Sequence, residues 1–194
     1  MRAHAMIAVW MNVAKEHDQE FNDWYETEHL AEVVAIDGIL SGRRYCNPDG
    51  ELRYLVLYEA IENTIESGAG FQAMLTKPTP WTVRIRKLCD KPSKRSNFRI
   101  RHDTGNAGDT GALLAIHSAD GPGAAAPQSS RDALEGCLRY RAFEDAIRPG
   151  AWLELYEFEN LASVPVSRAM LPGRKDTHAE TYQAIGTPKV RAST

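Results

Sequence analysis

Residues 38–60 read GILSGRRYCNPDGELRYLVLYEA, and this stretch decides the fold. Two runs of strand-forming residues, 39–46 and 53–60, flank an Asn-Pro-Asp-Gly turn signal at 47–50. Along the second run, successive side chains alternate as expected of a strand with two different faces. The stretch therefore predicts a β-hairpin.

The same pattern returns in residues 136–157, GCLRYRAFEDAIRPGAWLELYE, at a constant offset of 98 from the first hairpin. No gap is needed, and the triplet Leu-Tyr-Glu at 57–59 recurs at 155–157. Arg43 likewise recurs as Arg141. Apolar strands alone would not place this triplet twice in register, so we interpret the two segments as similar hairpins with the same buried face.

Around the first hairpin, the pattern is that of an α+β unit. Asp18 is expected to cap a long helix that ends before Gly38, with its apolar side chains on one face at a period of 3.6. The order β-α-β-β-α-β is the ferredoxin-like arrangement. Further strands are predicted at 6–13 and 97–102, and helices at 18–36, 64–75 and 82–88.

The second half resumes the order with a strand at 112–117, a helix at 162–170 and a strand at 178–186. It differs in the segment 118–136, where glycines and prolines leave only 131–135 able to form a helix. The sequence therefore predicts that the second copy lacks the long first helix.

These observations predict tandem ferredoxin-like repeats that form one intrachain α/β barrel with antiparallel sheets. The first repeat spans 1–104 and carries the candidate site, a degenerate second repeat spans 111–188, and a tail spans 189–194. A sheet face left bare would be an aggregation hazard, and two units in one chain cover each other. The chain can then be a monomer or a homodimer.

Composition excludes several classes of protein. A net charge of −3 and a pI near 6.1 argue against a nucleic-acid or anionic-membrane binder. No apolar run is long enough to span a membrane, and no signal peptide is recognised. The three cysteines form no CxxC pair and the histidines have no metal-ligand spacing, so we expect a cytoplasmic protein without a metal site. The basic stretch 84–101 is interpreted as a solvated linker.

The long first helix holds the candidate catalytic residues. His29 lies three residues after Glu26, and a carboxylate beside an imidazole is the minimum arrangement for a general acid/base. We expect His29 to be the acid/base, Glu26 or Glu28 to orient it, and Tyr25 to donate a hydrogen bond. The alternative is structural, because such pairs are common on solvated helix faces.

A second set of residues is predicted to bind substrate. Arg43 and its neighbour Arg44 are suited to a carboxylate or phenolate, although a structural role explains Arg43 equally well. The aromatic members are suited to a pocket wall, but core packing is the better explanation of each. The set comprises Trp10, Asn12, Trp24, Arg43, Tyr54 and Trp81.

Residues 21–45, 54–60 and 77–88 resemble the dimeric α/β-barrel superfamily, and within it EthD-like and related uncharacterised stress-responsive-barrel proteins. The likeness lies in a W-Y-x-x-E-H-L-P-E signature, matched here by Trp24, Tyr25, Glu28, His29, Leu30 and Glu32, with Gly38 following. Ala31 and Asp37 stand where the family usually has proline. The resemblance covers roughly the first half of the chain.

The resemblance implies a pocket between sheet and helices that hosts chemistry on small molecules, with His29 at the position of the acid/base. We expect a cofactor-independent enzyme that performs decarboxylation, cyclisation, dehydration or isomerisation on a small aromatic or unsaturated carbonyl metabolite. One alternative is a haem-dependent or cofactor-free monooxygenase. Another is a non-catalytic ligand-binding stress-response protein.

Overall fold

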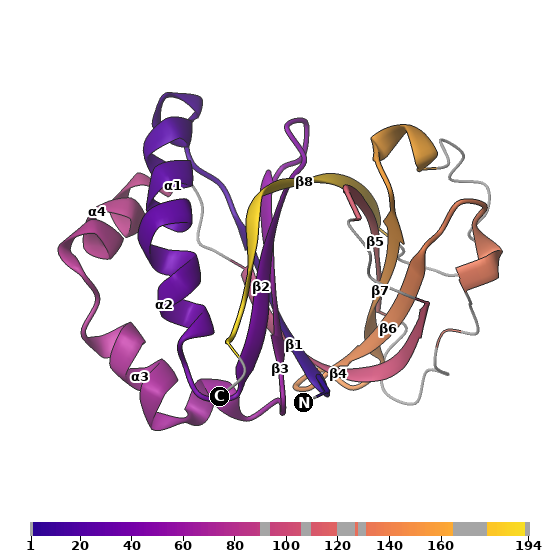
Figure 1. Ribbon diagram of the computed structural model, residues 1–194, viewed down its shortest axis with the longest axis horizontal. Coiled ribbons are helices and arrows are strands. Elements are labelled where there is room, and N and C mark those ends of the chain that lie inside the picture. Colours follow the sequence, from indigo (N-terminus) through magenta and orange to yellow (C-terminus); the bar gives the residue numbers. More distant parts are fainter. Residues whose placement is uncertain are drawn as a thin grey trace.

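The computed structural model describes residues 2–89, 94–105, 110–119, 127, 131–164 and 178–192. Within these residues, eight antiparallel strands follow one another around a closed barrel in the order β1-β3-β2-β8-β5-β7-β6-β4. Figure 1 shows the barrel with the helices α1 to α4 gathered on one side of it. The α+β barrel with antiparallel sheets that the sequence predicts is confirmed.

The first half of the chain supplies half of the barrel and the helices that cover it. Its strands are β1 (Ala5–Met11), β2 (Ile39–Cys46), β3 (Tyr54–Ala60) and β4 (Lys94–Gly105). Its helices are α1 (Asp18–Trp24), the π-helical turn η2 (Tyr25–His29), α2 (Leu30–Val34), α3 (Ala69–Thr76) and α4 (Pro80–Leu88), with 3-10 turns at Lys15–His17 and Ile65–Ser67. Each predicted element of this half is present, with ends that differ by a few residues.

The second half supplies the remaining strands, β5 (Ala112–Ala119), β6 (Arg139–Asp145), β7 (Ala151–Phe158) and β8 (His178–Val190). Short 3-10 turns lie at Arg131–Ala133 and Leu161–Ser163. Most of the helix expected over 162–170, and most of the loop at 118–136, fall outside the described residues. Strand β8 continues past residue 188, where the tail was expected to begin.

The two halves have the same strand order. It is β4-β1-β3-β2 in the first half and β8-β5-β7-β6 in the second, which is the ferredoxin-like order in both cases. The halves meet along two seams, where β2 pairs with β8 and β4 pairs with β6. Each half therefore closes the open edges of the other, which removes unpaired strand edges.

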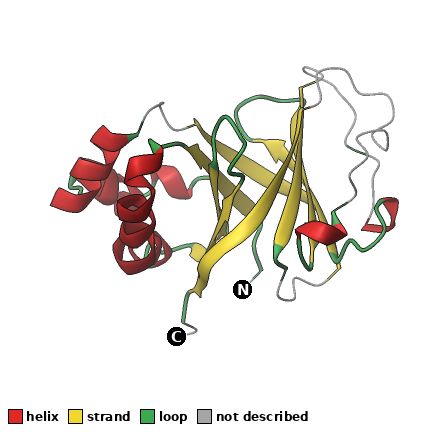
Figure 2. Ribbon diagram, turned by 90° about the horizontal axis from the view of Figure 1, so that it is seen from above, coloured by secondary structure: helices red, strands yellow, loops and turns green. Residues whose placement is uncertain are grey.

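Side chains alternate between the barrel interior and its outer surface. The interior core draws on both halves and includes Met6, Ala8, Trp10, Tyr45, Leu55, Leu57, Phe98, Leu113, Ala115, Phe143, Leu153, Leu155 and Tyr182. The other face of the first half packs against α1 to α4 through a separate core that includes Phe21, Trp24, Tyr25, Leu30, Val33, Tyr54, Tyr58, Phe71 and Ile85. Figure 2 shows these helices stacked beside the barrel and not across its opening.

The long helix is held at both ends by side chains from elsewhere. At its start, the N-cap is His17 without a side-chain hydrogen bond, so the prediction that Asp18 caps the helix is wrong. Asp18 instead accepts hydrogen bonds from Arg53 and Tyr54, each at 2.8 Å. Just past its end, Arg191 donates to the carbonyl of Ile36 at 2.7 Å, a cation placed at the C-terminal end of the helix where the helix dipole favours positive charge. No helix within the described residues has the length and apolar character needed to cross a membrane.

Candidate functional site

The candidate site is built on a break in the regular geometry of the long helix. Between α1 and α2 the chain makes one π-helical turn, in which the amide of Leu30 donates to the carbonyl of Tyr25, five residues earlier. Such single turns are rare in proteins, and those that occur often lie at functional sites. This one spans Tyr25 to His29, and so it holds all four predicted catalytic residues.

His29 lies flat against Trp24, with ring centroids 4.1 Å apart and an angle of 13° between the rings. Its side chain is only 13% exposed, and its Nδ1 lies 3.0 Å from Oε2 of Glu32. When the ring is neutral, donation from Nδ1 to the carboxylate leaves Nε2 as the basic nitrogen. The pair is therefore an imidazole–carboxylate dyad that an indole ring holds in place.

The partner of His29 is Glu32, and the prediction that Glu26 or Glu28 orients the ring is wrong. The wider π-helical turn rotates the earlier carboxylates away from the imidazole, whereas Glu32 follows His29 in regular α-helix at i+3. Sequence reasoning considered the residues before the histidine and missed the carboxylate after it. The spacing of His29 and Glu32 was the signal that could have found it.

Glu26 and Glu28 have other partners. Glu26 accepts from Nη1 of Arg44 at 3.0 Å and from the amide of Thr187 in β8 at 3.3 Å. Glu28 accepts from the hydroxyl of Thr79, at the start of α4, at 2.6 Å. Glu26 thus ties the helix to the second half of the barrel, and Glu28 ties it to α4.

Tyr25 packs edge-on against His29 with ring centroids 5.3 Å apart, but its hydroxyl lies against the Met11 sulfur at 3.8 Å. Burial raises the pKa of this tyrosine well above its usual value, although the nearby Arg44 acts to lower it. Burial, and then the neighbouring Tyr25, also raises the pKa of Tyr58. Tyr25 is therefore a buried residue whose hydroxyl stays protonated, and its ring forms one side of the site.

The Arg44 guanidinium packs against the ring of Tyr25. Its Cζ is 4.4 Å from the Tyr25 ring centroid, and its Nη2 donates to Asn22 at 2.5 Å. The side chain is almost fully buried between the sheet and the helix. Sequence reasoning selected its neighbour Arg43 for the site, but Arg44 is the arginine that the strand presents to the helices.

The six predicted substrate-binding residues do not form one group. Trp24 lies beside His29, Tyr54 donates to Asp18, Asn12 accepts from Arg53 at 2.9 Å, and Trp81 packs partly buried on the helix-side core.

Trp10 and Arg43 lie on the other face of the sheet. Trp10 belongs to the barrel interior, and Arg43 donates there to Thr110. Successive side chains of a strand point to opposite faces of the sheet, so both residues are separated from His29 by the sheet. The prediction that they share its site is therefore wrong.

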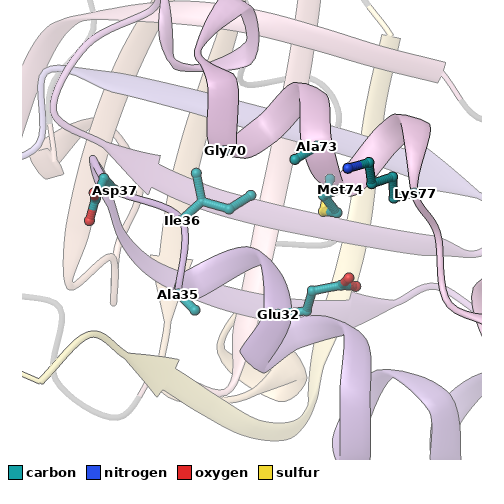
Figure 3. A pocket seen from close by; sticks show the side chains of 8 residues that line it. All are labelled: Glu32, Ala35, Ile36, Asp37, Gly70, Ala73, Met74 and Lys77. Atoms are coloured by element: carbon teal, nitrogen blue, oxygen red, sulfur yellow. The ribbon is translucent and has the colours of Figure 1, made fainter.

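An open groove lies beside the dyad, between α2 and α3, with a volume of about 480 Å³. It is lined by Glu32, Ala35, Ile36, Asp37, Gly70, Ala73, Met74 and Lys77. Figure 3 shows the Glu32 carboxylate on the α2 side of the groove, and Met74 and Lys77 on the α3 side. Glu32 therefore belongs both to the dyad and to the wall of the groove.

Within the described part of the chain, no group of three His, Cys, Asp or Glu side chains is placed to hold a metal ion. Within the described residues the three cysteines form no disulfide bond, and Cys46 and Cys89 are partly buried. Burial raises the pKa of the Cys46 thiol, which disfavours the reactive thiolate. Among the described side chains, the His29–Glu32 pair is suited to proton transfer.

Comparison with known proteins finds similarity in structure only. No family model and no curated protein matches the sequence. A putative monooxygenase from Lactobacillus acidophilus NCFM superposes with a TM-score of 0.61 at 11% identity, covering 94% of each chain. A putative monooxygenase from Fusobacterium nucleatum subsp. nucleatum gives 0.62 at 7% identity, covering 100% of this chain and 98% of its own.

An anthrone oxidase-like protein gives a TM-score of 0.63 at 9% identity, with 98% of this chain and 94% of that chain covered. Because coverage is nearly complete on both sides, these structures match the whole barrel and not one half of it. At such low identity the likeness shows the fold alone. The chain therefore shares its ferredoxin-like barrel with proteins described as monooxygenases.

Proposed function

We propose that this protein is a cofactor-independent enzyme that removes a proton from a small aromatic or unsaturated carbonyl metabolite, with His29 and Glu32 as its acid/base pair. The observation that carries the proposal is the contact of 3.0 Å between His29 Nδ1 and a Glu32 carboxylate that also lines the groove. A carboxylate and an imidazole in contact can share a proton, which suits them to general acid/base work.

The groove supports this reading through its composition. Its apolar lining, including Ile36 and Met74, suits a mainly apolar molecule. Lys77 lines the opposite side of the groove from Glu32, and an ammonium group there would stabilise negative charge on a carbonyl oxygen as the proton leaves. One site per chain follows, because the dyad has no counterpart at the matching positions of the second half.

A cofactor-free monooxygenase is the second candidate, and the three structural neighbours favour it. The first step would be the same proton removal. A methylene carbanion then adds oxygen, and the resulting hydroperoxide loses water to give a ketone. The balance is one CH2 group and one O2 converted to one C=O group and one water molecule.

Anthrone is a suitable probe because its methylene is flanked by two aryl rings. Under argon in heavy water, we expect the protein to accelerate deuterium exchange at that methylene, followed by NMR. In air, oxygen consumption tests the second candidate on the same sample. Binding of anthrone without exchange or oxygen uptake would favour a non-catalytic ligand-binding protein.

Two variants test the dyad. Glu32→Gln and His29→Asn should each lower the exchange rate by about 10²–10⁴-fold. Asparagine retains a donor near the Nδ1 position, so a mild loss in His29→Asn with a severe loss in Glu32→Gln would identify Glu32 as the group that meets the substrate. His17→Asn, before α1, is the matched control and should leave the rate unchanged. Exchange rates equal to wild type in both dyad variants would contradict the proposal.

A further inference from the structure

The indole of Trp24, which lies flat against His29, is itself held by a side chain from another helix. Its Nε1 donates to the hydroxyl of Thr82 at 3.2 Å, and both Trp24 and Thr82 are almost fully buried. Thr82 lies in the first turn of α4, 58 residues later in the chain. The ring that packs against the dyad is therefore fixed by a helix that carries neither member of the dyad.

The π-helical turn is the feature that allows this stack. Trp24 and His29 are five residues apart, and in a regular α-helix their side chains would lie about 140° apart around the helix axis. A π-helical turn joins residues five apart by hydrogen bonds, so it brings such positions onto one side of the helix. The centroid distance of 4.1 Å and the angle of 13° show that the two rings overlap face to face.

Thr82 belongs to a chain of hydrogen bonds that ends at Glu28. The hydroxyl oxygens of Thr82 and Thr79 lie 3.1 Å apart, and Thr79 donates to the Glu28 carboxylate at 2.6 Å. A hydroxyl has one hydrogen, so Thr82 donates either to Thr79 or directly to Glu28, whose Oε1 is 3.5 Å away. Every donor in the chain thus points towards the carboxylate, and hydrogen bonds in such a series strengthen one another.

We propose that Thr82 is a positioning residue for the acid/base pair: it fixes the Trp24 indole, and the indole fixes the plane of the His29 ring. This role rests on the proposed function, because a ring that can tilt would bring Nε2 to the substrate in the productive orientation less often. Glu32 holds the ring at Nδ1 alone, and the flat contact with Trp24 opposes rotation about that hydrogen bond. Glu28 completes the arrangement as the final acceptor of the chain.

The first measurement does not depend on activity. It is NMR of the His29 ring protons, which are assigned by their loss in His29→Asn. An aromatic ring shields protons stacked on its face, so these signals should lie upfield in the wild-type protein. Thr82→Val keeps the shape of the side chain but leaves the indole N–H without its acceptor, and it should move the signals towards those of an unstacked histidine. Thr82→Ser retains the hydroxyl and should restore them.

The second measurement is deuterium exchange into anthrone. Thr82→Val should lower the rate at saturating anthrone by about tenfold or more, because the imidazole is no longer held in one orientation. The anthrone concentration that gives half the maximal rate should stay within about twofold of wild type, since Thr82 does not line the groove. Thr82→Ser should recover most of the rate. Thr181→Val, on β8 in the other half of the barrel, is the matched control and should change neither measurement.

Ring signals in Thr82→Val that coincide with those of wild type would overturn the positioning role, and so would displaced signals with an unchanged exchange rate. If the wild-type protein does not exchange deuterium into anthrone, the proposed function fails, whereas the ring signals still decide whether Thr82 positions His29. Circular dichroism establishes that each variant is folded. Thr82→Ala removes the same hydroxyl with less steric demand, and it should displace the ring signals in the same direction if Thr82→Val does not fold.

Discussion

The guanidinium of Arg141 lies 2.7 Å from the carboxylate of Glu59, which comes 82 residues earlier in the chain and belongs to the other half of the barrel. The same guanidinium lies 2.6 Å from Glu157, the residue that corresponds to Glu59 in the repeat. Arg141 thus joins two equivalent carboxylates inside the barrel. Arg43, its own counterpart, donates to Thr110 instead.

Replacing Arg141 by methionine should destabilise the protein by about 3–5 kcal/mol, because Glu157 is left buried without its cation. Urea unfolding measures the loss. Arg101→Met, which breaks an exposed ion pair with Glu144, is the matched control and should cost about 0–1 kcal/mol. Adding Glu157→Gln to Arg141→Met should recover part of the loss, and no recovery would count against this explanation.

Gly186 has a φ of +65° and lies against Glu26, so that an added Cβ would fall 1.8 Å from the Glu26 carboxylate. Gly186→Ala should therefore cost more than the roughly 1 kcal/mol expected from backbone strain alone. Gly136→Ala isolates that strain, because Gly136 has a φ of +75° and its nearest neighbour would be 3.8 Å away. Thermal unfolding compares the two variants.

Removing the carboxylate with Glu26→Ala in the Gly186→Ala background should bring the cost of the alanine close to that of Gly136→Ala. If Gly186→Ala is no worse than Gly136→Ala in the wild-type background, Glu26 does not hold the position that its contacts with Arg44 and Thr187 imply.

Thr79 serves two functions at the start of α4. Its hydroxyl accepts from the amide of Thr82 at 3.0 Å, which caps the helix, and donates to Glu28 at 2.6 Å. Thr79→Val should lower the free energy of unfolding by about 1 kcal/mol through loss of the cap. Thr79→Ser keeps the hydroxyl and should be close to wild type, as measured by chemical denaturation. Equal stability of both variants would mean that the cap contributes nothing.

Acid should weaken the fold partly through Asp18 and Asp103. Burial acts to raise the pKa of each carboxyl, but hydrogen bonds from Arg53 to Asp18 and from Arg139 to Asp103 outweigh it and hold both below the usual value of 3.8. A depressed folded-state pKa contributes stability above the unfolded pKa, and that stability is lost as the pH falls through the folded value.

Asp18→Asn should therefore be less stable than wild type near pH 6, and the difference should shrink as the pH falls below about 3.8. Urea midpoints measured from neutral to acid pH give the comparison. Asp49→Asn, in the exposed turn between β2 and β3, changes the same formal charge and should show no such convergence. A difference between Asp18→Asn and wild type that stays constant down to acid pH would rule out this linkage.

The strands could be predicted because their pattern is local: alternation and an Asn-Pro-Asp-Gly turn are enough to define the hairpin of β2 and β3. The gap-free repeat also pointed to the barrel, since the matched Leu57 and Leu155 both lie in its interior. The face of the sheet to which each strand side chain points was harder to predict. Arg43 and Arg44 are adjacent in sequence, yet one faces the interior and the other the helices, and only the register with β3 decides which.

The i, i+3 spacing of His29 and Glu32 made this pair a candidate, but the sequence could not rule out Glu26, because the π-helical turn depends on packing that no local pattern records. In a regular helix, Glu26 would lie beside the imidazole. In the wider π-helical turn, the Glu26 carboxylate instead contacts Arg44 and the Thr187 amide of β8. The helix, its chemistry-bearing residues and its apolar face were predicted, but the partner of His29 was missed. Glu32 belonged to the recognised signature and was given no role.

Strand β8 lies near the C-terminal end of the sequence, but it contacts residues of the first half, which the ribosome synthesises much earlier. It forms one seam of the barrel with β2, and Thr187 and Arg191, within it and just after it, bind Glu26 and the end of the dyad helix. During synthesis, β2 therefore lacks its neighbour on one side until β8 has been made. Its free edge can pair with other chains in that interval. The helix that carries His29 acquires its last anchors only when residues 178–191 have left the ribosome, so a nascent chain is expected to gain the dyad geometry in its final step of folding.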